Sequence, residues 1–305
     1  MKHSTYFQRA NLLLQLLPFV SEEEDFALKG GTAINFFNRD LPRLSVDIDL
    51  CYLPLTDRES SLNHISESLQ KISNRVTQVL PNLTFFLKKD KETKNVVALI
   101  VNRKGQIVKI EPNPVLRGAI HPVEKCELVL KAQALFEQSI SLNCLSFADL
   151  YGGKICAALD RQHPRDLFDV KLLLENEGIT DKIRKAFIVY LISHPRPIVE
   201  LLKPSLNEIN SVFAGEFQGM ALIEITLDEL ERARERLIKQ INESLIDKER
   251  RFLLSFKRMG PEWELLELDG VKNLPAVKWK LLNLEHMDKK KHGTAVEKLK
   301  KHLQL

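Results

Sequence analysis

Two aspartates at alternate positions, Asp47 and Asp49, are the residues whose spacing first suggests chemistry in this chain. They lie in residues 46–53, VDIDLCYL, where apolar and acidic residues alternate with the period of a β-strand. Side chains at i and i+2 of a strand project to one side, about 6–7 Å apart, so both carboxylates can converge on one divalent cation or on a pair. An exposed edge strand with two solvated acids gives the same pattern, so the assignment depends on the surrounding residues.

Gly30-Gly31-Thr32 supplies part of that context, sixteen residues and more before the aspartates. The motif stands between a predicted strand at 26–29 and a predicted helix at 33–38. Glycine lets the backbone approach a phosphate closely, and a helix N-terminus offers unpaired N–H groups and the positive end of a dipole. The Thr32 hydroxyl can add a further hydrogen bond. A plain tight turn is the alternative interpretation.

A third acid, Glu111, ends a predicted strand at 106–111, on the same face as Lys109. With Asp47 and Asp49 it can complete a three-carboxylate cluster. Two Mg²⁺ ions need such a cluster when they bridge triphosphate oxygens, activate an attacking hydroxyl and stabilise departing pyrophosphate. A solvated strand end is the alternative for Glu111.

The elements that must position these residues form an α+β pattern. Predicted strands lie at 26–29, 46–53, 83–88, 95–102, 106–111, 127–131 and 139–145, and predicted helices at 5–17, 33–38 and 57–79. From Ser146, which with Asp149 forms a capping box, the chain is predicted to be helical throughout. This includes a helix at 165–176 and one that the Thr226–Glu229 capping box opens and that ends at 245. We therefore expect a mixed sheet with helices in residues 1–145 and a mainly helical lobe in residues 146–305.

The composition favours a compact, two-lobed soluble protein. The 305 residues are 44% apolar and carry a formal charge of +4, enough for a sizeable core and too apolar for global disorder. No apolar run reaches the roughly 20 residues of a membrane span, and no cleavage site follows the N-terminal apolar stretch, so we expect a cytoplasmic protein with no membrane contact. The four cysteines are scattered, which indicates neither a disulfide framework nor a zinc site.

The positive charge is concentrated near the C-terminus. Residues 272–305 contain nine lysines and three acids. A solvated helix face is one explanation of such a run, and contact with the phosphates of a nucleic acid is the other.

Two sequence blocks resemble the AbiEii/AbiGii-type nucleotidyltransferase toxins, a branch of the DNA polymerase beta-like nucleotidyltransferase superfamily found in bacterial toxin–antitoxin and phage-defence systems. The first block is LKGGTAINFFNRDLPRLSVDIDL, and the second is DLYGGKICAALDRQHPRDLFDVKLLL. Together they span about residues 25–177. The resemblance implies a polymerase-beta-like catalytic sheet in the N-terminal part, followed by the helical lobe.

The resemblance also assigns roles to residues. It implies a nucleotide-binding set of Gly30, Gly31, Thr32, Ser45, Lys154, Arg165 and Asp166. It implies a catalytic set of Asp47, Asp49, Glu111, Lys154 and Asp169, of which Asp47, Asp49 and Glu111 bind metal. Two departures from the superfamily pattern occur here, Gly-Gly-Thr in place of Gly-Ser and Glu111 where many members have aspartate. Arg165 and Asp169, spaced i, i+4, can also form a simple surface salt bridge.

The expected activity is Mg²⁺-dependent transfer of a nucleoside monophosphate from an NTP to an acceptor hydroxyl, with two Mg²⁺ ions as cofactors and release of pyrophosphate. By resemblance the protein is a toxin with a cognate antitoxin, and its favoured acceptor is the 3′ end of tRNA. Alternatives are a protein or small-molecule acceptor, a non-catalytic NTP-binding interaction protein, and a phosphotransferase using Ser45.

Overall fold

The computed structural model describes residues 4–305, which divide into two compact units. The sheet unit runs to Leu150 and also contains Glu216–Glu224. The helical unit comprises Tyr151–Gly215 and Ile225–Leu305. The division therefore falls inside helix α5 (Phe147–Arg161), a few residues beyond the expected boundary at 145, and the chain returns once to the sheet unit.

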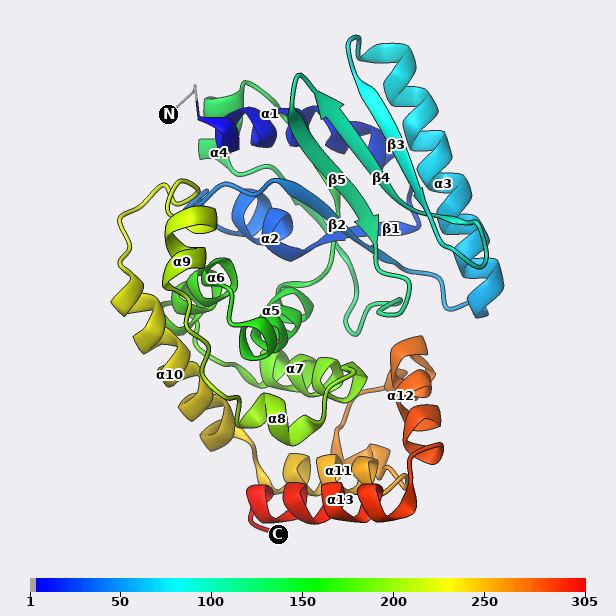
Figure 1. Cartoon of the computed structure of the whole chain (residues 1–305), viewed down its shortest axis with the longest axis vertical. Coiled ribbons are helices and arrows are strands. Elements are labelled where there is room, and N and C mark those ends of the chain that lie inside the picture. Colours follow the sequence, from blue (N-terminus) through cyan, green and yellow to red (C-terminus); the bar gives the residue numbers. More distant parts are fainter. Residues whose placement is uncertain (1–3) are drawn as a thin grey trace. The chain divides into compact units, whose positions relative to one another are not determined.

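A mixed seven-stranded sheet forms the centre of the sheet unit, in the order β3-β4-β5-β2-β1-β7-β6 (Figure 1). The strands are β1 (Phe26–Lys29), β2 (Asp47–Tyr52), β3 (Thr84–Lys89), β4 (Val96–Arg103), β5 (Gln106–Pro112), β6 (Glu124–Glu127) and β7 (Ser141–Cys144). The two parallel pairs are β2 with β5 and β1 with β7, and all other neighbours are antiparallel. The strand predicted at 46–53 is confirmed as β2.

Helices α1 (Thr5–Ser21) and α3 (Arg58–Val79) pack against this sheet and against each other. Figure 1 shows α1 crossing behind β5 and β4. Helix α3 begins where the Asp57 carboxylate accepts a hydrogen bond from Ser60 N at 2.9 Å. Its buried apolar residues recur every three or four positions, the spacing of one helical face. The remaining short helices of the unit are α2 (Gly30–Ala33), η1 (Ile34–Asn38) and α4 (Leu130–Phe136).

The strand expected at 127–131 is wrong. Strand β6 ends at Glu127, and the chain enters α4 three residues later. The sequence of α4, LKAQALF, consists largely of strong helix formers, and this local preference prevails where no further strand is available for pairing. The turn between β4 and β5 is as expected, since Lys104 and Gly105 both have positive φ, at 49° and 86°, in a two-residue hairpin.

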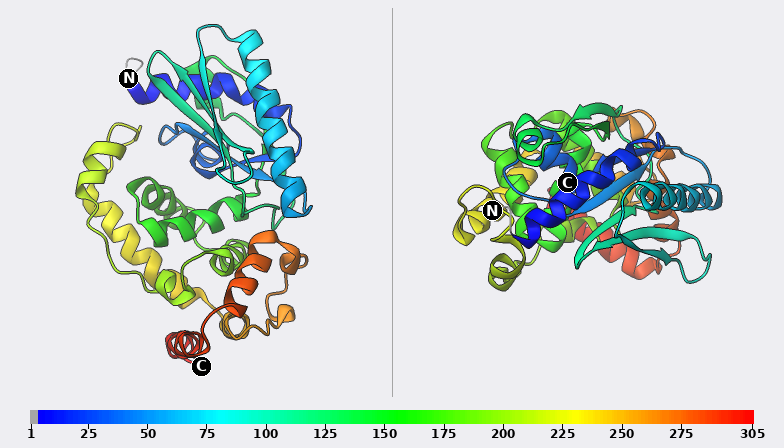
Figure 2. Two further views of the ribbon diagram at one scale, coloured as in Figure 1. Left: turned by 45° about the vertical axis from the view of Figure 1, so that its right-hand side comes forward. Right: turned by 90° about the horizontal axis from the view of Figure 1, so that it is seen from above.

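The second unit is helical, as predicted. Its elements are α5 (Phe147–Arg161), α6 (Pro164–Glu175), α7 (Asp181–Ser193), α8 (Ile198–Leu202), α9 (Asn210–Val212), η2 (Phe213–Phe217), α10 (Leu227–Ser244), α11 (Asp247–Lys257), η3 (Trp263–Leu265), η4 (Val271–Asn273), α12 (Pro275–Glu285) and α13 (Lys289–Leu303). Figure 2 shows α11 and α13 side by side, as their contacts require. The capping box of Thr226 and Glu229 is present at the start of α10.

Gly152 and Gly153 allow α5 to approach α7 closely. A β-carbon at Gly152 would lie 2.8 Å from the main chain of Ala186 and Phe187, and one at Gly153 would lie 3.2 Å from the ring of Tyr190. Glycine in a helix costs about 1 kcal/mol relative to alanine. Close packing of two helices of the same unit accounts for that cost at Gly152.

A return segment, residues 216–224, joins the sheet unit to a part of the chain far away in sequence. Arg43 and Ala221 form an isolated antiparallel bridge, with Leu44 N donating to Met220 O at 2.8 Å. Leu222 N donates to Pro42 O at the same distance. Because residues 42–45 lead into β2, the return segment supports the loop that precedes the two aspartates.

The four cysteines are all free thiols, and three of them are buried. Between residues 4 and 305 there is no helix with the length and apolar character that crossing a membrane demands.

Candidate active site

The predicted acids lie on one face of two neighbouring strands, β2 and β5. Asp49 of β2 is in register with Glu111 of β5 on one side and with Lys29 of β1 on the other. Asp47 is in register with Lys109. Register partners on adjacent strands project to the same face. The sheet therefore places the three predicted carboxylates and two lysines on the same face.

The lysines and an arginine partly neutralise these acids. Lys109 Nζ contacts the Glu111 carboxylate, and Arg9 of α1 approaches Asp47, with 3.9 Å between Nη2 and Oδ1. Arg9 Nε also donates to Ile107 O at 2.9 Å, which holds its side chain over the sheet. Sequence reasoning did not select Arg9, because nothing local distinguishes it from other polar residues of α1. The shared strand face of Lys109 and Glu111 was visible in the sequence.

Gly30 and Asp49 are in close approach. Gly30 has φ of +70°, and a β-carbon there would lie 2.5 Å from Asp49 Oδ2. A side chain at this position would therefore both strain the backbone and displace the carboxylate. Position 30 therefore requires glycine for two reasons: its φ is positive, and the Asp49 carboxylate occupies the space of a side chain.

Thr32 links the glycine motif to β2. Its Oγ1 lies 2.6 Å from Asp47 O and 2.9 Å from Ser45 Oγ, and the side chain is 1% exposed. The Thr32 hydroxyl donates to Asp47 O, which as a carbonyl oxygen can only accept, and it is also hydrogen-bonded to the Ser45 hydroxyl. Both hydroxyls that were expected to face the nucleotide thus form a buried chain that fixes the start of β2.

Arg43 lies beside the second glycine. Its guanidinium donates from Nη1 to Leu44 O at 2.9 Å and is 2% exposed, and Nη2 would be 2.6 Å from a β-carbon on Gly31. Gly31 therefore leaves room for a buried arginine. Arg43 is thus one of the largest fully buried side chains among the residues that the structure describes.

Carboxylate oxygens are the ligand type that a hard divalent cation such as Mg²⁺ prefers. Within residues 4–305, no three His, Cys, Asp or Glu side chains converge in a group that could hold a metal ion. Mg²⁺ in proteins is commonly held by one or two carboxylates together with waters and substrate phosphates. The pair of Asp47 and Asp49 meets that requirement, whereas Glu111, engaged with Lys109, stays a prediction as a third ligand.

The residues of the second sequence block form a cluster of their own in the helical unit. Lys154 of α5 lies 2.8 Å from Asp166 Oδ1 and 3.0 Å from Asp169 Oδ2, both on α6. Arg161 Nε approaches Asp166 Oδ2 at 2.5 Å. Lys154 is 7% exposed and both aspartates are almost fully buried. Because Asp166 and Asp169 lie on the same side of α6, both carboxylates contact the ammonium of Lys154.

Burial alone would raise the pKa of Asp166, but the charge of Lys154 and the hydrogen bonds and charge of Arg161 outweigh it. The pKa of Asp166 consequently lies well below its ordinary value. Arg165, the neighbouring member of the predicted nucleotide set, is half-buried in the first turn of α6, where its main-chain N–H donates to His163 Nδ1 at 3.1 Å.

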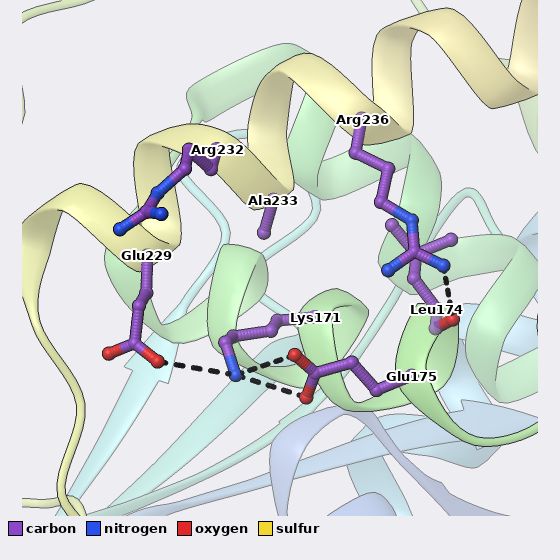
Figure 3. A pocket seen from close by; sticks show the side chains of 7 residues that line it. All are labelled: Lys171, Leu174, Glu175, Glu229, Arg232, Ala233 and Arg236. Atoms are coloured by element: carbon purple, nitrogen blue, oxygen red, sulfur yellow. Dashed lines mark hydrogen bonds and ion pairs between the residues drawn. The ribbon is translucent and has the colours of Figure 1, made fainter.

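A pocket of about 260 Å³ lies between α6 and α10 in the same unit (Figure 3). Its charged groups satisfy one another: Lys171 Nζ is 2.8 Å from Glu175 Oε1 and 3.7 Å from Glu229 Oε1. Arg236 donates to Leu174 O at 2.8 Å. These contacts hold α10 against α6, so we assign the pocket a structural role.

Comparison with known proteins gives a family and a fold. The family model described as the nucleotidyl transferase AbiEii toxin of a type IV toxin–antitoxin system matches residues 11–281. The chain is similar in structure to MenT4, a nucleotidyltransferase toxin from Mycobacterium tuberculosis, with a TM-score of 0.62 and 13% sequence identity. The match covers 92% of this chain and 93% of that chain. A comparison with curated protein sequences gives no significant match.

These findings confirm the α+β fold class and the family that the two sequence blocks indicated. At 13% identity, the structural similarity demonstrates a shared fold, and the family model extends over both units. The family description names a nucleotidyl transferase, which implies an NTP substrate. It also names a toxin–antitoxin system, which implies an antitoxin partner. The chain therefore belongs to the AbiEii family of nucleotidyltransferase toxins of type IV toxin–antitoxin systems.

Proposed function

We propose that this nucleotidyltransferase transfers a nucleoside monophosphate from an NTP to the 3′-terminal hydroxyl of tRNA, with Mg²⁺ as its cofactor. The observation that carries the proposal is the pair of carboxylates on β2, with Asp49 packed against the backbone of Gly30. That arrangement puts the acids next to the first residues of a glycine-rich turn, where main-chain N–H groups can bind phosphate oxygens.

Asp47 and Asp49 would hold the metal. When bound, Mg²⁺ would offset charge on the triphosphate and lower the pKa of an attacking hydroxyl. The residues of the chain would hold the two carboxylates in position. Thr32 and Ser45 fix the backbone of Asp47, and the absence of a side chain on Gly30 leaves room for the Asp49 carboxylate. Two Mg²⁺ ions and the participation of Glu111 are further parts of the proposal.

The assignments in the second block rest on the resemblance. We propose that Lys154, Arg165 and Asp166 contribute to nucleotide binding and that Asp169 or Glu111 accepts the proton of the acceptor hydroxyl. Lys154 is bound by Asp166 and Asp169, so a phosphate would have to compete with two aspartates for its ammonium. Charge neutralisation in this cluster also keeps α5 and α6 together.

The acceptor and the location follow from the family and the charge of the chain. A toxin that modifies the 3′ end of tRNA requires a surface that binds phosphates, and residues 272–305 carry nine lysines against three acids. NTP and tRNA are both cytoplasmic molecules, so the proposal places the activity in the cytoplasm. A role in phage defence, with a cognate antitoxin that limits the toxin, is part of the same proposal.

The test is incubation of the purified protein with total tRNA, Mg²⁺ and each of the four α-labelled NTPs. We expect label on tRNA with the wild type and with Asp269→Asn, which changes an exposed aspartate of the helical unit. The double variant Asp47→Asn, Asp49→Asn should transfer no label, because amides replace both charged ligands without a change of shape. When tRNA is omitted, all of the label should remain in free NTP.

The outcome distinguishes the remaining alternatives. Label on a protein or small molecule in a cell extract, with none on tRNA, would overturn the acceptor and retain the reaction. Label that moves only from γ-labelled NTP would overturn nucleotidyl transfer in favour of phosphotransfer. Equal transfer by wild type and double variant would overturn the assignment of the two aspartates.

A further inference from the structure

A second pocket, of about 450 Å³, lies in the helical unit between α8, the end of α11 and the first half of α13. It is lined by Pro197, Ile198, Val199, Glu200, Lys257, Lys290, Lys291, Thr294, Ala295, Lys298 and Leu299. Its size lies within the range of pockets that hold small organic ligands. None of these residues belongs to either cluster of the candidate active site.

The lining combines apolar side chains with an excess of positive charge. Aliphatic residues of α8 and α13 supply the apolar part, and four lysines supply the cations. The single acid, Glu200, is half-exposed and pairs with Arg196 at 3.4 Å. The pocket therefore favours a ligand that has both an apolar part and an anionic group.

Lys257, at the end of α11, is the central observation. The residue is 6% exposed and lines the pocket, and within residues 4–305 its ammonium makes neither a hydrogen bond nor an ion pair; the nitrogen itself is not among the fully buried side-chain atoms, so it is open to the pocket. Burial lowers its pKa. An ammonium taken out of water without a partner is costly unless an anion compensates it. This charge therefore lacks a counterion that the pocket has room to accept.

The start of α13 adds positive charge at the same place. Its first turn contains Lys289, Lys290 and Lys291 and no acid, although the N-terminus of a helix already carries the positive end of the dipole. Only Asp288, the N-cap, offsets it, by accepting from Lys291 N at 3.0 Å. Lysines are favourable at the other end of this helix, where Lys300 and Lys301 lie in the last turn. An anion bound beside the first turn would therefore stabilise it.

Two nearby features show that this excess is specific to the pocket. Lys280, also buried in this unit, donates to the carbonyl oxygens of His194, Pro195 and Arg196 at 2.5–3.1 Å. In the pocket of Figure 3 the cations face acids or carbonyls at bonding distance. Lys280 and the cations of Figure 3 thus have partners, whereas the Lys257 ammonium has none among residues 4–305.

We infer that this pocket binds a phosphate group, with the sugar or base attached to it lying on the apolar side chains. Lys257 and the first turn of α13 form the anion site, and Ile198, Val199 and Leu299 form the apolar contact. The phosphate can come from a free nucleotide or from the backbone of an RNA strand. Only the RNA source rests on the proposed function, because phosphate binding itself requires no transfer reaction.

The experiment measures phosphate binding directly, without Mg²⁺ and without an activity assay. Wild type is compared with a pocket variant, Lys290→Gln, Lys291→Gln, and with a control variant of equal charge, Lys272→Gln, Lys301→Gln. All four lysines are exposed, so both variants should fold. The probes are inorganic phosphate, a nucleoside monophosphate and a short labelled single-stranded RNA, each titrated by fluorescence polarisation or by the shift in Tm.

We expect the pocket variant to lose about tenfold in affinity for at least one probe, while the control variant binds that probe as the wild type does. If the affinity for RNA is among those lost, the source of the phosphate is an RNA strand. In that case the slope of log affinity against log salt concentration should fall by about 0.7 for each phosphate contact removed. A loss confined to inorganic phosphate and the nucleotide identifies a free nucleotide. Equal losses in both variants, or no saturable binding by wild type, would overturn the inference.

Lys257→Met provides an independent readout on the folded protein. Without any ligand, the variant should unfold at a higher temperature than wild type, because an unpaired buried charge is replaced by an apolar side chain of similar length. Addition of phosphate should then raise Tm in the wild type and leave the variant unchanged. A variant that is destabilised and still responds fully to phosphate would show that Lys257 has a structural role only.

Discussion

The carboxylate of Asp49 occupies the place where a side chain on Gly30 would have to lie. Oδ2 is 2.5 Å from the position of a β-carbon on Gly30, and the register of β1 with β2 sets Lys29 opposite Asp49. The glycine-rich turn and the two aspartates are separated by seventeen residues in sequence, yet the pairing of β1 and β2 makes them one site. A change in the turn must therefore affect the acid.

Gly30→Ala should abolish nucleotidyl transfer and destabilise the sheet unit. The positive φ of +70° costs a residue with a side chain about 1–2 kcal/mol, and the methyl group also displaces Asp49. Gly178→Ala is the matched control, because Gly178 has the same φ of +70° with nothing within 4 Å of its β-carbon. Denaturant unfolding and label transfer measure both variants. Equal activity in the two would contradict the role of the Asp49 contact.

Thr32→Val should lower the free energy of unfolding by about 1–3 kcal/mol, because Asp47 O loses its buried donor and the Ser45 hydroxyl loses its hydrogen bond to Thr32. Transfer activity should fall more steeply than stability, since the start of β2 carries Asp47. Thr32→Ser retains the hydroxyl and should recover most of both. Activity that survives in the valine variant at a temperature where it remains folded would show that this chain of hydroxyls does not position Asp47.

Asp166→Asn should destabilise the helical unit by about 1–3 kcal/mol near neutral pH, since Lys154 keeps Asp169 but loses one of its two carboxylates, and Arg161 loses the Asp166 carboxylate. The pKa of Asp166 is lower in the folded state than in the unfolded state, so its ionised form contributes stability above about pH 4. That contribution is lost as pH falls further toward the folded-state pKa. The difference between wild type and variant should therefore be largest from about pH 5 to pH 7 and shrink in acid. Urea unfolding over this range tests the sign, and a difference that grows in acid would contradict it.

Gly152→Ala and Gly293→Ala should act in opposite directions, although both place alanine inside a helix. At Gly152 the methyl group meets α7 main chain at 2.8 Å, so we expect a loss of about 1–3 kcal/mol. At Gly293 in α13 nothing lies within 4 Å, so the better helix propensity should add about 0.5–1 kcal/mol. Thermal unfolding of both variants decides. A stabilised Gly152→Ala would show that α5 and α7 can separate without cost.

Local signals in the sequence predicted most of the fold. The alternation in VDIDLCYL identified β2, Lys104-Gly105 identified the hairpin, and Thr226 with Glu229 identified the start of α10. Each of these depends on neighbours within a few residues, which a sequence displays. The error at 127–131 also has a local cause, because Glu127–Val129 are extended while the residues after them prefer a helix.

Contacts between distant residues could not be predicted. The approach of Arg9 to Asp47 depends on how α1 lies on the sheet, and the cluster of Lys154 with Asp166 and Asp169 depends on the angle between α5 and α6. The spacing in sequence allowed a surface salt bridge or a functional role for these aspartates. Only packing shows that they are buried and share one ammonium.

The return segment has a consequence for the timing of synthesis. The hydrogen bonds that Pro42 and Leu44 make with Leu222 and Met220 cannot form until those two residues have left the ribosome, so the sheet unit stays incomplete until more than two-thirds of the chain is made. A growing chain folds as it emerges, at about 5–20 residues per second, and here the loop before the aspartates is the last part of its unit to be secured. A truncated product ending before residue 220 would carry every residue of both sequence blocks and still lack the support of that loop. For a toxin, this delays the completion of its catalytic unit until the protein is nearly whole.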